Sequence, residues 1–93
     1  MPSIIVKHTV RDYDTWKKVF DADSPNREVI STGGKIFRSM ENPNEVTVVM
    51  HVKHLDSAKA WIADPKLKAT MDSAGVTSAP EISFLQDGGS FTA

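Results

Sequence analysis

The spacing of apolar and polar residues divides the chain into short strands and amphipathic helices. From Ser3 to Val10, isoleucine and valine dominate, and Lys7 and Thr9 alternate with their neighbours as in a strand covered on one face. Between positions 13 and 20 the large apolar side chains recur every three or four residues, which predicts an amphipathic helix. The apolar side of that helix would consist of Tyr13, Trp16, Val19 and Phe20.

Two further strands are predicted on either side of a turn. The segments Lys35 to Met40 and Glu45 to Lys53 read as strands, and Asn42-Pro43-Asn44 between them are all turn-forming residues. Gly33-Gly34 is expected to punctuate the chain before the first of these strands. We therefore predict a β-hairpin over residues 35–53.

The second half of the chain predicts a broken helix followed by a last strand. A helix is expected from near Asp56, with a break at Asp64-Pro65 because proline suits a first helical turn but not an interior. It should restart over Lys66 to Ser73, and Glu81 to Leu85 reads as a strand.

This order of elements predicts an α+β fold of the ferredoxin-like βαββαβ type. Right-handed crossovers would place the strands in the spatial order fourth, first, third, second, as an antiparallel sheet with the helices on one face. We expect a single domain over residues 1–86 and a flexible C-terminal tail over residues 87–93.

The hairpin register decides which side chains share a face of the sheet. If the turn has two or four residues, Arg38 lies opposite Val49 and Ile36 opposite His51. The helix-facing side then holds Ile4, Val6, Phe37, Val48, Met50, Val52, Ile82 and Phe84. The other side holds Ile5, Lys7, Thr9, Ile36, Arg38, Met40, Thr47, Val49, His51, Glu81, Ser83 and Leu85. An odd shift would exchange Arg38 and His51 for Phe37 and Met50.

A half-apolar sheet face of this kind is too apolar to remain open to solvent. Packing against a second copy of the chain would cover it through an isologous interface, so we predict a homodimer. The mixture of apolar and polar groups also suits a cavity between the two sheets, in which a few polar groups orient a mostly apolar ligand.

Composition narrows the classes of partner. The 93 residues include 11 basic and 12 acidic side chains, a formal net charge of −1, which disfavours nucleic acid as a partner. Cysteine is absent, and no apolar run is long enough to cross a bilayer, so we expect no membrane partner and a cytoplasmic location. The three histidines show no metal-ligand spacing, and we predict neither metal nor cofactor.

Four segments carry a resemblance to a known superfamily: Ile4 to His8, Tyr13 to Lys17, Asn42 to Val46, and Trp61 to Pro65. In this layout the chain resembles the dimeric α/β-barrel superfamily, which includes antibiotic-biosynthesis monooxygenases, haem-degrading monooxygenases, muconolactone isomerases and uncharacterised stress-responsive proteins. The resemblance covers nearly the whole chain and implies a fold rather than a reaction. The first-strand asparagine and the haem-ligating histidine of the haem-degrading members have no counterpart here, so the resemblance implies no haem.

The candidate site residues come from the predicted open face of the sheet, together with one tryptophan. His51 could act as a general base near neutral pH, and Arg38 could stabilise an enolate or phenolate. Trp61 either packs under the second helical region or closes the mouth of the cavity. His8 is interpreted as a satisfied residue at a strand end. The predicted ligand-binding set is Lys7, Thr9, Arg38, Thr47, His51 and Trp61.

Three functions are compatible with these residues. The first is binding of an apolar or aromatic small molecule that bears a polar group. The second is cofactor-independent oxygenation or isomerisation on the same scaffold. The third is a structural or regulatory homodimer without a ligand, which a dimer interior well below about 300–1,000 Å³ would favour.

Overall fold

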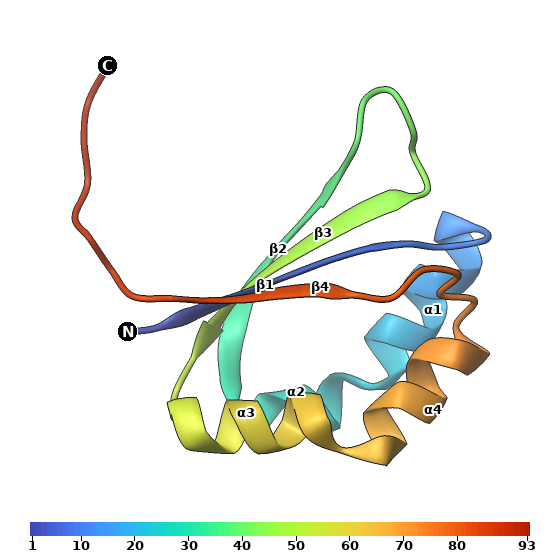
Figure 1. The fold of residues 1–93 in the computed structure, drawn as a ribbon, viewed down its shortest axis with the longest axis horizontal. Helices are drawn as coiled ribbons and strands as arrows, with labels where there is room; N and C mark the ends of the chain where they lie inside the picture. The colour runs from blue at the N-terminus through green and yellow to red at the C-terminus, as the bar shows by residue number, and fades with distance from the viewer.

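The computed structural model describes residues 1–93 and contains eight helices and strands. In chain order these are β1 (Ser3–Thr9), α1 (Tyr13–Ala22), α2 (Ser24–Glu28), β2 (Ser31–Arg38), β3 (Glu45–Val52), α3 (Leu55–Ala63), α4 (Pro65–Ser73) and β4 (Glu81–Leu85). Residues 86–93 form no helix or strand and extend away from the body of the molecule (Figure 1).

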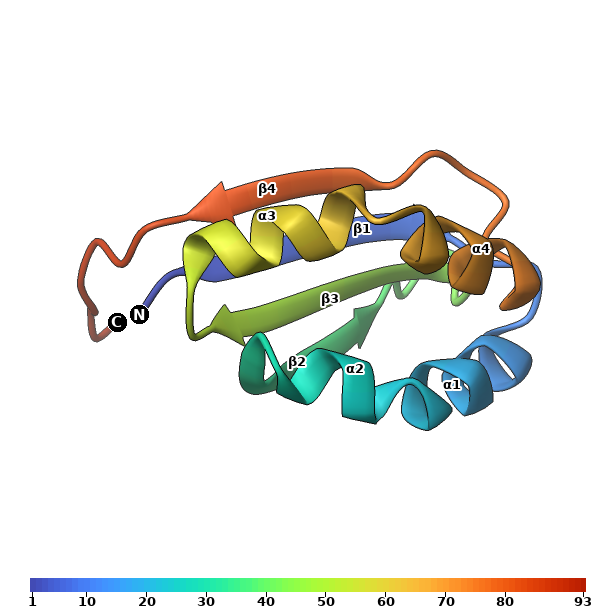
Figure 2. The same ribbon diagram turned by 90° about the horizontal axis from the view of Figure 1, so that it is seen from below.

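The four strands form one antiparallel sheet in the order β2-β3-β1-β4. All four helices cover the same face of this sheet (Figure 1). Figure 2 shows α1 and α2 on the side of β2, and α3 and α4 on the side of β1 and β4. The predicted α+β ferredoxin-like class and the predicted strand order are therefore confirmed.

Local signals begin the helices where the sequence predicted them. The carboxylate of Asp12 caps α1 by accepting a hydrogen bond from the Thr15 amide at 3.0 Å. Asp64 caps α4 in the same way, accepting from the Lys66 amide at 2.9 Å, and Pro65 occupies the first turn. The extended backbone of Asp64 separates α3 from α4, which confirms the predicted break.

The predicted hairpin register is wrong. Phe37 lies opposite Thr47 and Arg38 opposite Val46, and the Ser39 amide donates to the Glu45 carbonyl at 3.0 Å. The turn from Met40 to Asn44 thus contains an odd number of residues, which reverses the faces of β2 relative to the prediction.

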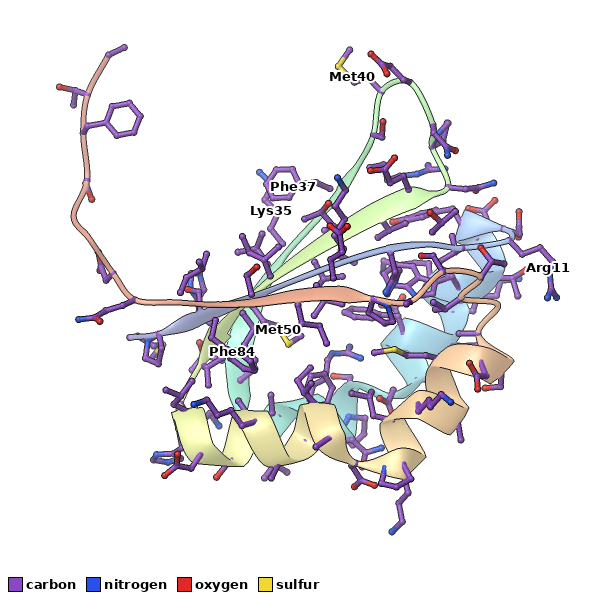
Figure 3. All side chains as sticks on the ribbon, viewed as in Figure 1. Arg11, Lys35, Phe37, Met40, Met50 and Phe84 are labelled. Carbon is purple, nitrogen blue, oxygen red and sulfur yellow. The ribbon has the colours of Figure 1, made fainter.

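This reversal moves Ile36 and Arg38 to the helix-facing side and Phe37 to the open side. Figure 3 shows Lys35 and Phe37 on the face away from the helices, and Met50 and Phe84 on the helical face. The register of β3 against β1 is unaffected, so His51 stays on the open face, opposite Ser3. An odd turn is predicted to move both Arg38 and His51 to the helical face, and in the structure only Arg38 lies there.

Gly33 and Gly34 lie inside β2 and do not precede it, because the strand begins at Ser31. The pairing shifts between Ser31 and Gly33, and Gly33 has a φ of 128°, a conformation that glycine adopts readily. At Gly34 the two strands approach so closely that a Cβ atom would overlap the Val49 carbonyl oxygen.

The core lies between the sheet and the helices. Trp16 is its largest member and is 3% exposed. The buried cluster consists of Ile4, Val6, Val10, Trp16, Ile30, Val46, Val48, Met50, Val52, Ala58 and Ala74. None of the helices has the length and apolar character needed to span a membrane.

Candidate functional site

The open face of the sheet brings together four of the six predicted ligand-binding residues. Lys7 lies opposite Thr47, and Thr9 and His51 point to the same face. The Lys7 ammonium pairs with Glu45 at 3.0 Å, and this hydrogen bond raises the pKa of Lys7. His51 Nδ1 lies 3.4 Å from the Ser3 hydroxyl. This face therefore carries both polar and apolar side chains, and none of its four predicted residues lines the cavity described below.

Arg38 and Trp61 lie on the other side of the sheet. The Arg38 guanidinium stacks 3.8 Å over the Tyr13 ring, and its Nε donates to the Pro43 carbonyl at 2.9 Å. Trp61 belongs to α3 and faces the core between the helices and the sheet. The structure does not bring His51 together with Arg38, nor Trp61 with the four residues of the open face.

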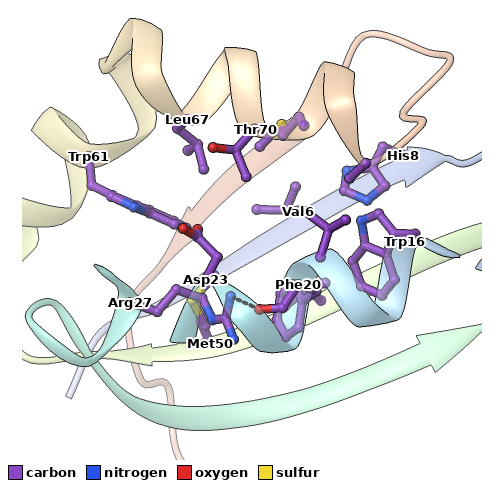
Figure 4. A pocket seen from close by; sticks show the side chains of 14 residues that line it. Val6, His8, Trp16, Phe20, Asp23, Arg27, Met50, Trp61, Leu67 and Thr70 are labelled. Carbon is purple, nitrogen blue, oxygen red and sulfur yellow. Dashed lines mark hydrogen bonds between the residues drawn. The ribbon is translucent and has the colours of Figure 1, made fainter. Parts of the chain in front are cut away.

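A cavity of about 50 Å³ lies between the sheet and the two pairs of helices. Its walls are mainly apolar and come from β1, β3 and all four helices or their junctions (Figure 4). The lining residues are Val6, His8, Trp16, Val19, Phe20, Asp23, Arg27, Val48, Met50, Trp61, Leu67, Thr70, Met71 and Ala74.

One wall of the cavity is a column of flat side chains. The ring of His8 meets the edge of Trp16 with centroids 5.7 Å apart, and Trp16 stacks on Phe20 at 4.9 Å. The Arg27 guanidinium continues the column 3.6 Å above the Phe20 ring. Figure 4 shows Trp61 on the opposite side. Such a slot between aromatic surfaces suits a flat ligand.

His8 is the most unusual polar group of the cavity. It is 6% exposed, and neither Nδ1 nor Nε2 has a hydrogen-bond partner. Burial lowers the pKa of His8 from its ordinary value of 6.5, so the imidazole is neutral at pH 7. The interpretation of His8 as a satisfied residue is wrong. Its two-residue spacing from Ile4 and Val6 was the signal that it shares their covered face.

Arg27 is the second unusual polar group. Its side chain is half-buried, Nη1 donates to the Phe20 carbonyl at 2.5 Å, and burial lowers the pKa of the guanidinium. The ion pairs of the chain are Lys7 with Glu45 and Lys17 with Asp21, and neither includes Arg27. No local sequence pattern points to Arg27, because its burial depends on how α2 packs.

Two open grooves on the surface share walls with the cavity. A groove of about 510 Å³ between α2 and the α3–α4 pair has Asp23, Trp61, Leu67 and Thr70 in common with the cavity. A second groove of about 540 Å³ runs along α1, α2 and β2, and Arg27 is among the residues that it shares with the cavity. Trp61 and Arg27 therefore stand between the buried space and the solvent.

No group of three or more histidine, aspartate or glutamate side chains converges as a metal site requires. The polar side chains that line the cavity are those of His8, Asp23, Arg27 and Thr70, and His8 and Arg27 lie against its aromatic rings. A neutral imidazole can accept a hydrogen bond or a proton on one nitrogen and donate a hydrogen bond from the other.

Comparison with solved structures identifies the fold. The cofactor-independent oxygenase SnoaB of Streptomyces nogalater superposes with a TM-score of 0.76 at 12% identity, over 99% of this chain and 97% of that chain. A candidate antibiotic biosynthesis monooxygenase of Bordetella bronchiseptica gives 0.74 at 14% identity, over 92% and 95%. A conserved protein of Methanosarcina mazei gives 0.60 at 16% identity, over 91% and 90%.

No family model matches the chain, and no curated relative matches it in sequence. The chain has the same ferredoxin-like fold as these solved structures. Within that class, its structural neighbours are proteins with the antibiotic biosynthesis monooxygenase fold. The resemblance seen in the sequence is thus confirmed at the level of the fold, and the reaction has to be argued from the site.

Proposed function

We propose that the protein binds a small apolar or aromatic molecule bearing a polar group, in the cavity between the sheet and the helices. The observation that carries this proposal is His8, which faces the cavity with both ring nitrogens unpartnered. Buried polar groups in folded proteins are nearly always hydrogen-bonded, and an exception calls for a partner from outside the chain. A ligand with a hydroxyl or carbonyl group would supply that partner.

The composition of the walls supports the same proposal. Ligand pockets are mostly apolar with a small number of polar groups that fix orientation. Here the polar side chains are His8, Asp23, Arg27 and Thr70, and the remaining lining residues are aliphatic or aromatic.

The volume of the cavity requires a movement on binding. A space of about 50 Å³ is below the roughly 300–1,000 Å³ of pockets that hold drug-sized ligands. Ala58 is the one buried residue of α3 and Leu67 the one of α4, so this helix pair is held by few core side chains. Displacement of Trp61 toward the outer groove would join that groove to the cavity.

The test is a titration of the protein with 2-naphthol, followed by amide and indole N–H chemical shifts. Trp16 and Trp61 are the only two tryptophans and lie on opposite walls, so both indole signals should shift saturably. His8→Leu should weaken binding about tenfold, as expected for the loss of one hydrogen bond inside an apolar site.

His54→Leu is the matched control, because it removes an exposed histidine that lines neither the cavity nor the two grooves next to it and should leave the affinity unchanged. Equal affinity of the His8→Leu variant and the unaltered protein would contradict the role of His8. Absence of saturable shifts at both indoles would contradict the cavity proposal and favour a structural dimer without ligand.

A second candidate function is proton transfer to and from the bound molecule, as in a cofactor-independent oxygenase or isomerase. It rests on the neutral imidazole of His8, which can take a proton from an acidic C–H group held in the cavity. The base role predicted for His51 is thereby assigned to His8, because His51 and Arg38 lie on opposite faces. Exchange of the α-protons of 1-tetralone in D₂O, faster with the protein than with the His8→Leu variant, would support it.

We also propose that the chain forms a homodimer through the open face of its sheet. Phe37 is 46% exposed and Leu85 42% exposed on this face, and Ile5 and Val49 lie between them. A second copy placed face to face would cover these side chains in an isologous interface. The dimer would leave the cavity on the helix side of each chain accessible.

A further inference from the structure

The guanidinium of Arg27 is a cation at the wall of the cavity without an ion-pair partner in the chain. We infer that the ligand of this cavity is an organic anion whose carboxylate pairs with Arg27 while its apolar part lies along the aromatic wall. This inference rests on the proposed binding function and adds the chemical class of the ligand. The argument depends on what surrounds Arg27 and on what its hydrogen bonds leave free.

The acidic side chains nearest to Arg27 are already engaged. Asp23 accepts a hydrogen bond from the Asn26 amide group at 2.7 Å, and Asp21 pairs with the Lys17 ammonium at 2.6 Å. Both carboxylates lie more than 4.0 Å from the nitrogens of Arg27, which is beyond the limit of an ion pair. Their charges raise the pKa of Arg27, but burial lowers it by more. The guanidinium is therefore partly desolvated and has no ion-pair partner, which is costly for a protein.

The hydrogen-bonding geometry leaves donors available. A guanidinium has five N–H donors in a planar fork, and one of them is used by the Phe20 carbonyl. One face of the plane is occupied by the Phe20 ring at 3.6 Å. A carboxylate binds at the edge of the plane and not at a face, because two parallel N–H groups at the edge can bind both of its oxygens.

The position of Arg27 relative to His8 sets the shape of the anion. The two residues are the ends of the column His8, Trp16, Phe20 and Arg27, with the two aromatic rings between them. A flat ring placed against this column, between it and Trp61 (Figure 4), would reach Arg27 with a carboxylate at one end. A hydroxyl or carbonyl group at its other end would meet His8.

The experiment compares 1-naphthoate with 1-naphthamide, which have the same shape and differ in charge. In the titration by chemical shift, the carboxylate should bind the unaltered protein at least about tenfold more tightly than the amide, because a hydrogen bond between two charged groups is stronger than one to a neutral group. Arg27→Met keeps an unbranched apolar stem and should remove this preference. Arg27→Lys keeps the charge without the fork and should retain part of it.

Arg11→Gln is the matched control. It also removes one positive charge, but Arg11 is exposed and lines neither the cavity nor the two grooves next to it, so the preference should persist. Thermal unfolding of each variant checks that it is folded. If Arg27→Met does not fold, Arg27→Lys still tests the role of Arg27, and the acid and amide comparison on the unaltered protein tests the preference for an anion by itself.

The outcomes separate this inference from the function on which it rests. Equal affinity for the acid and the amide, with saturable shifts at both indoles, would overturn the anion and leave the cavity proposal standing. A tenfold preference that persists in Arg27→Met would place the carboxylate elsewhere and overturn the role of Arg27. Absence of binding by both compounds and by 2-naphthol would overturn both proposals.

Discussion

At the scale of single residues, a buried imidazole without hydrogen bonds lowers stability. Leaving a polar group unsatisfied in the interior costs about 1–3 kcal/mol, and His8 has two nitrogens in this state. An aliphatic side chain of similar size would fit the same apolar surroundings without this cost. Side chains that reduce the stability of the fold are characteristic of functional sites, where binding or catalysis requires them.

The first prediction is that His8→Leu raises the free energy of unfolding by about 1 kcal/mol or more, because it removes both unsatisfied nitrogens. Urea denaturation of the two proteins at pH 7.5 measures the difference. His54→Leu removes an exposed histidine away from the open face and should change the stability by no more than about 0.5 kcal/mol. A loss of stability in His8→Leu would mean that the imidazole has a partner that stabilises the fold.

The second prediction concerns pH. Because burial lowers the pKa of His8 in the folded state, the unfolded chain binds more protons at this residue in the range between the lowered value and 6.5. Protonation of His8 therefore leaves the free energy of unfolding unchanged above about pH 6.5. As the pH falls from there toward the folded pKa, the free energy of unfolding decreases, with a slope of up to about 1.4 kcal/mol per pH unit. His8→Leu should flatten this part of a stability profile measured between pH 5 and 8, whereas an unchanged slope would exclude His8 as its source.

At the scale of elements, the sequence predicted the type and order of the strands and helices but not how β2 pairs. Alternation and capping residues act within a short stretch of chain, so β4 at Glu81–Leu85 and the break at Pro65 could be located from neighbouring residues alone. The register of β2 depends on whether the turn has an odd or even number of residues. Asn42-Pro43-Asn44 indicates a turn without fixing where it begins, and this uncertainty placed Arg38 and Phe37 on the wrong faces.

The third prediction tests the close approach of β2 and β3. Gly34→Ala would place a methyl group against the backbone of Val49 and 2.9 Å from the Met50 Cα atom, so the strands must separate. We expect a loss of at least about 2 kcal/mol in the free energy of unfolding. Gly88→Ala is the control, because nothing lies within 4 Å of its added carbon. Equal stability of the two variants would contradict the observed pairing of β2 with β3.

At the scale of the whole molecule, the sheet separates two surfaces with different chemistry. The helix side holds the cavity, and the open side holds the row of apolar residues assigned to the homodimer. The sequence predicted the apolar open face because alternation along β1 and β3 is independent of the hairpin. It did not predict the site, because a cavity arises from the packing of helices that no local pattern describes. Trp61 alone, of the predicted ligand-binding residues, lines it.

The fourth prediction is that Phe37→Glu produces monomers. An isologous interface would bury the introduced carboxylate without a partner in both copies, and the cost of removing the two charges from water would oppose association. Sedimentation velocity measures the mass, and circular dichroism confirms that the variant is folded. Val29→Glu introduces the same charge at a side chain 72% exposed on the helical side and should remain dimeric. A monomeric unaltered protein at high micromolar concentration would contradict the proposed interface.

The position of Trp61 between the cavity and the outer groove has a kinetic consequence. A ligand cannot reach the cavity by diffusion alone if an indole and the helix that carries it have to move first. The association rate should then reach a plateau as the ligand concentration rises, because the motion of the protein becomes the slow step. Stopped-flow measurements would show this plateau, and Trp61→Ala should raise it while shortening the residence time of the bound molecule. The dissociation rate of the bound molecule would thus be set by the motion of the side chain that covers it, and the protein would hold its ligand longer than the affinity of the open cavity alone would allow.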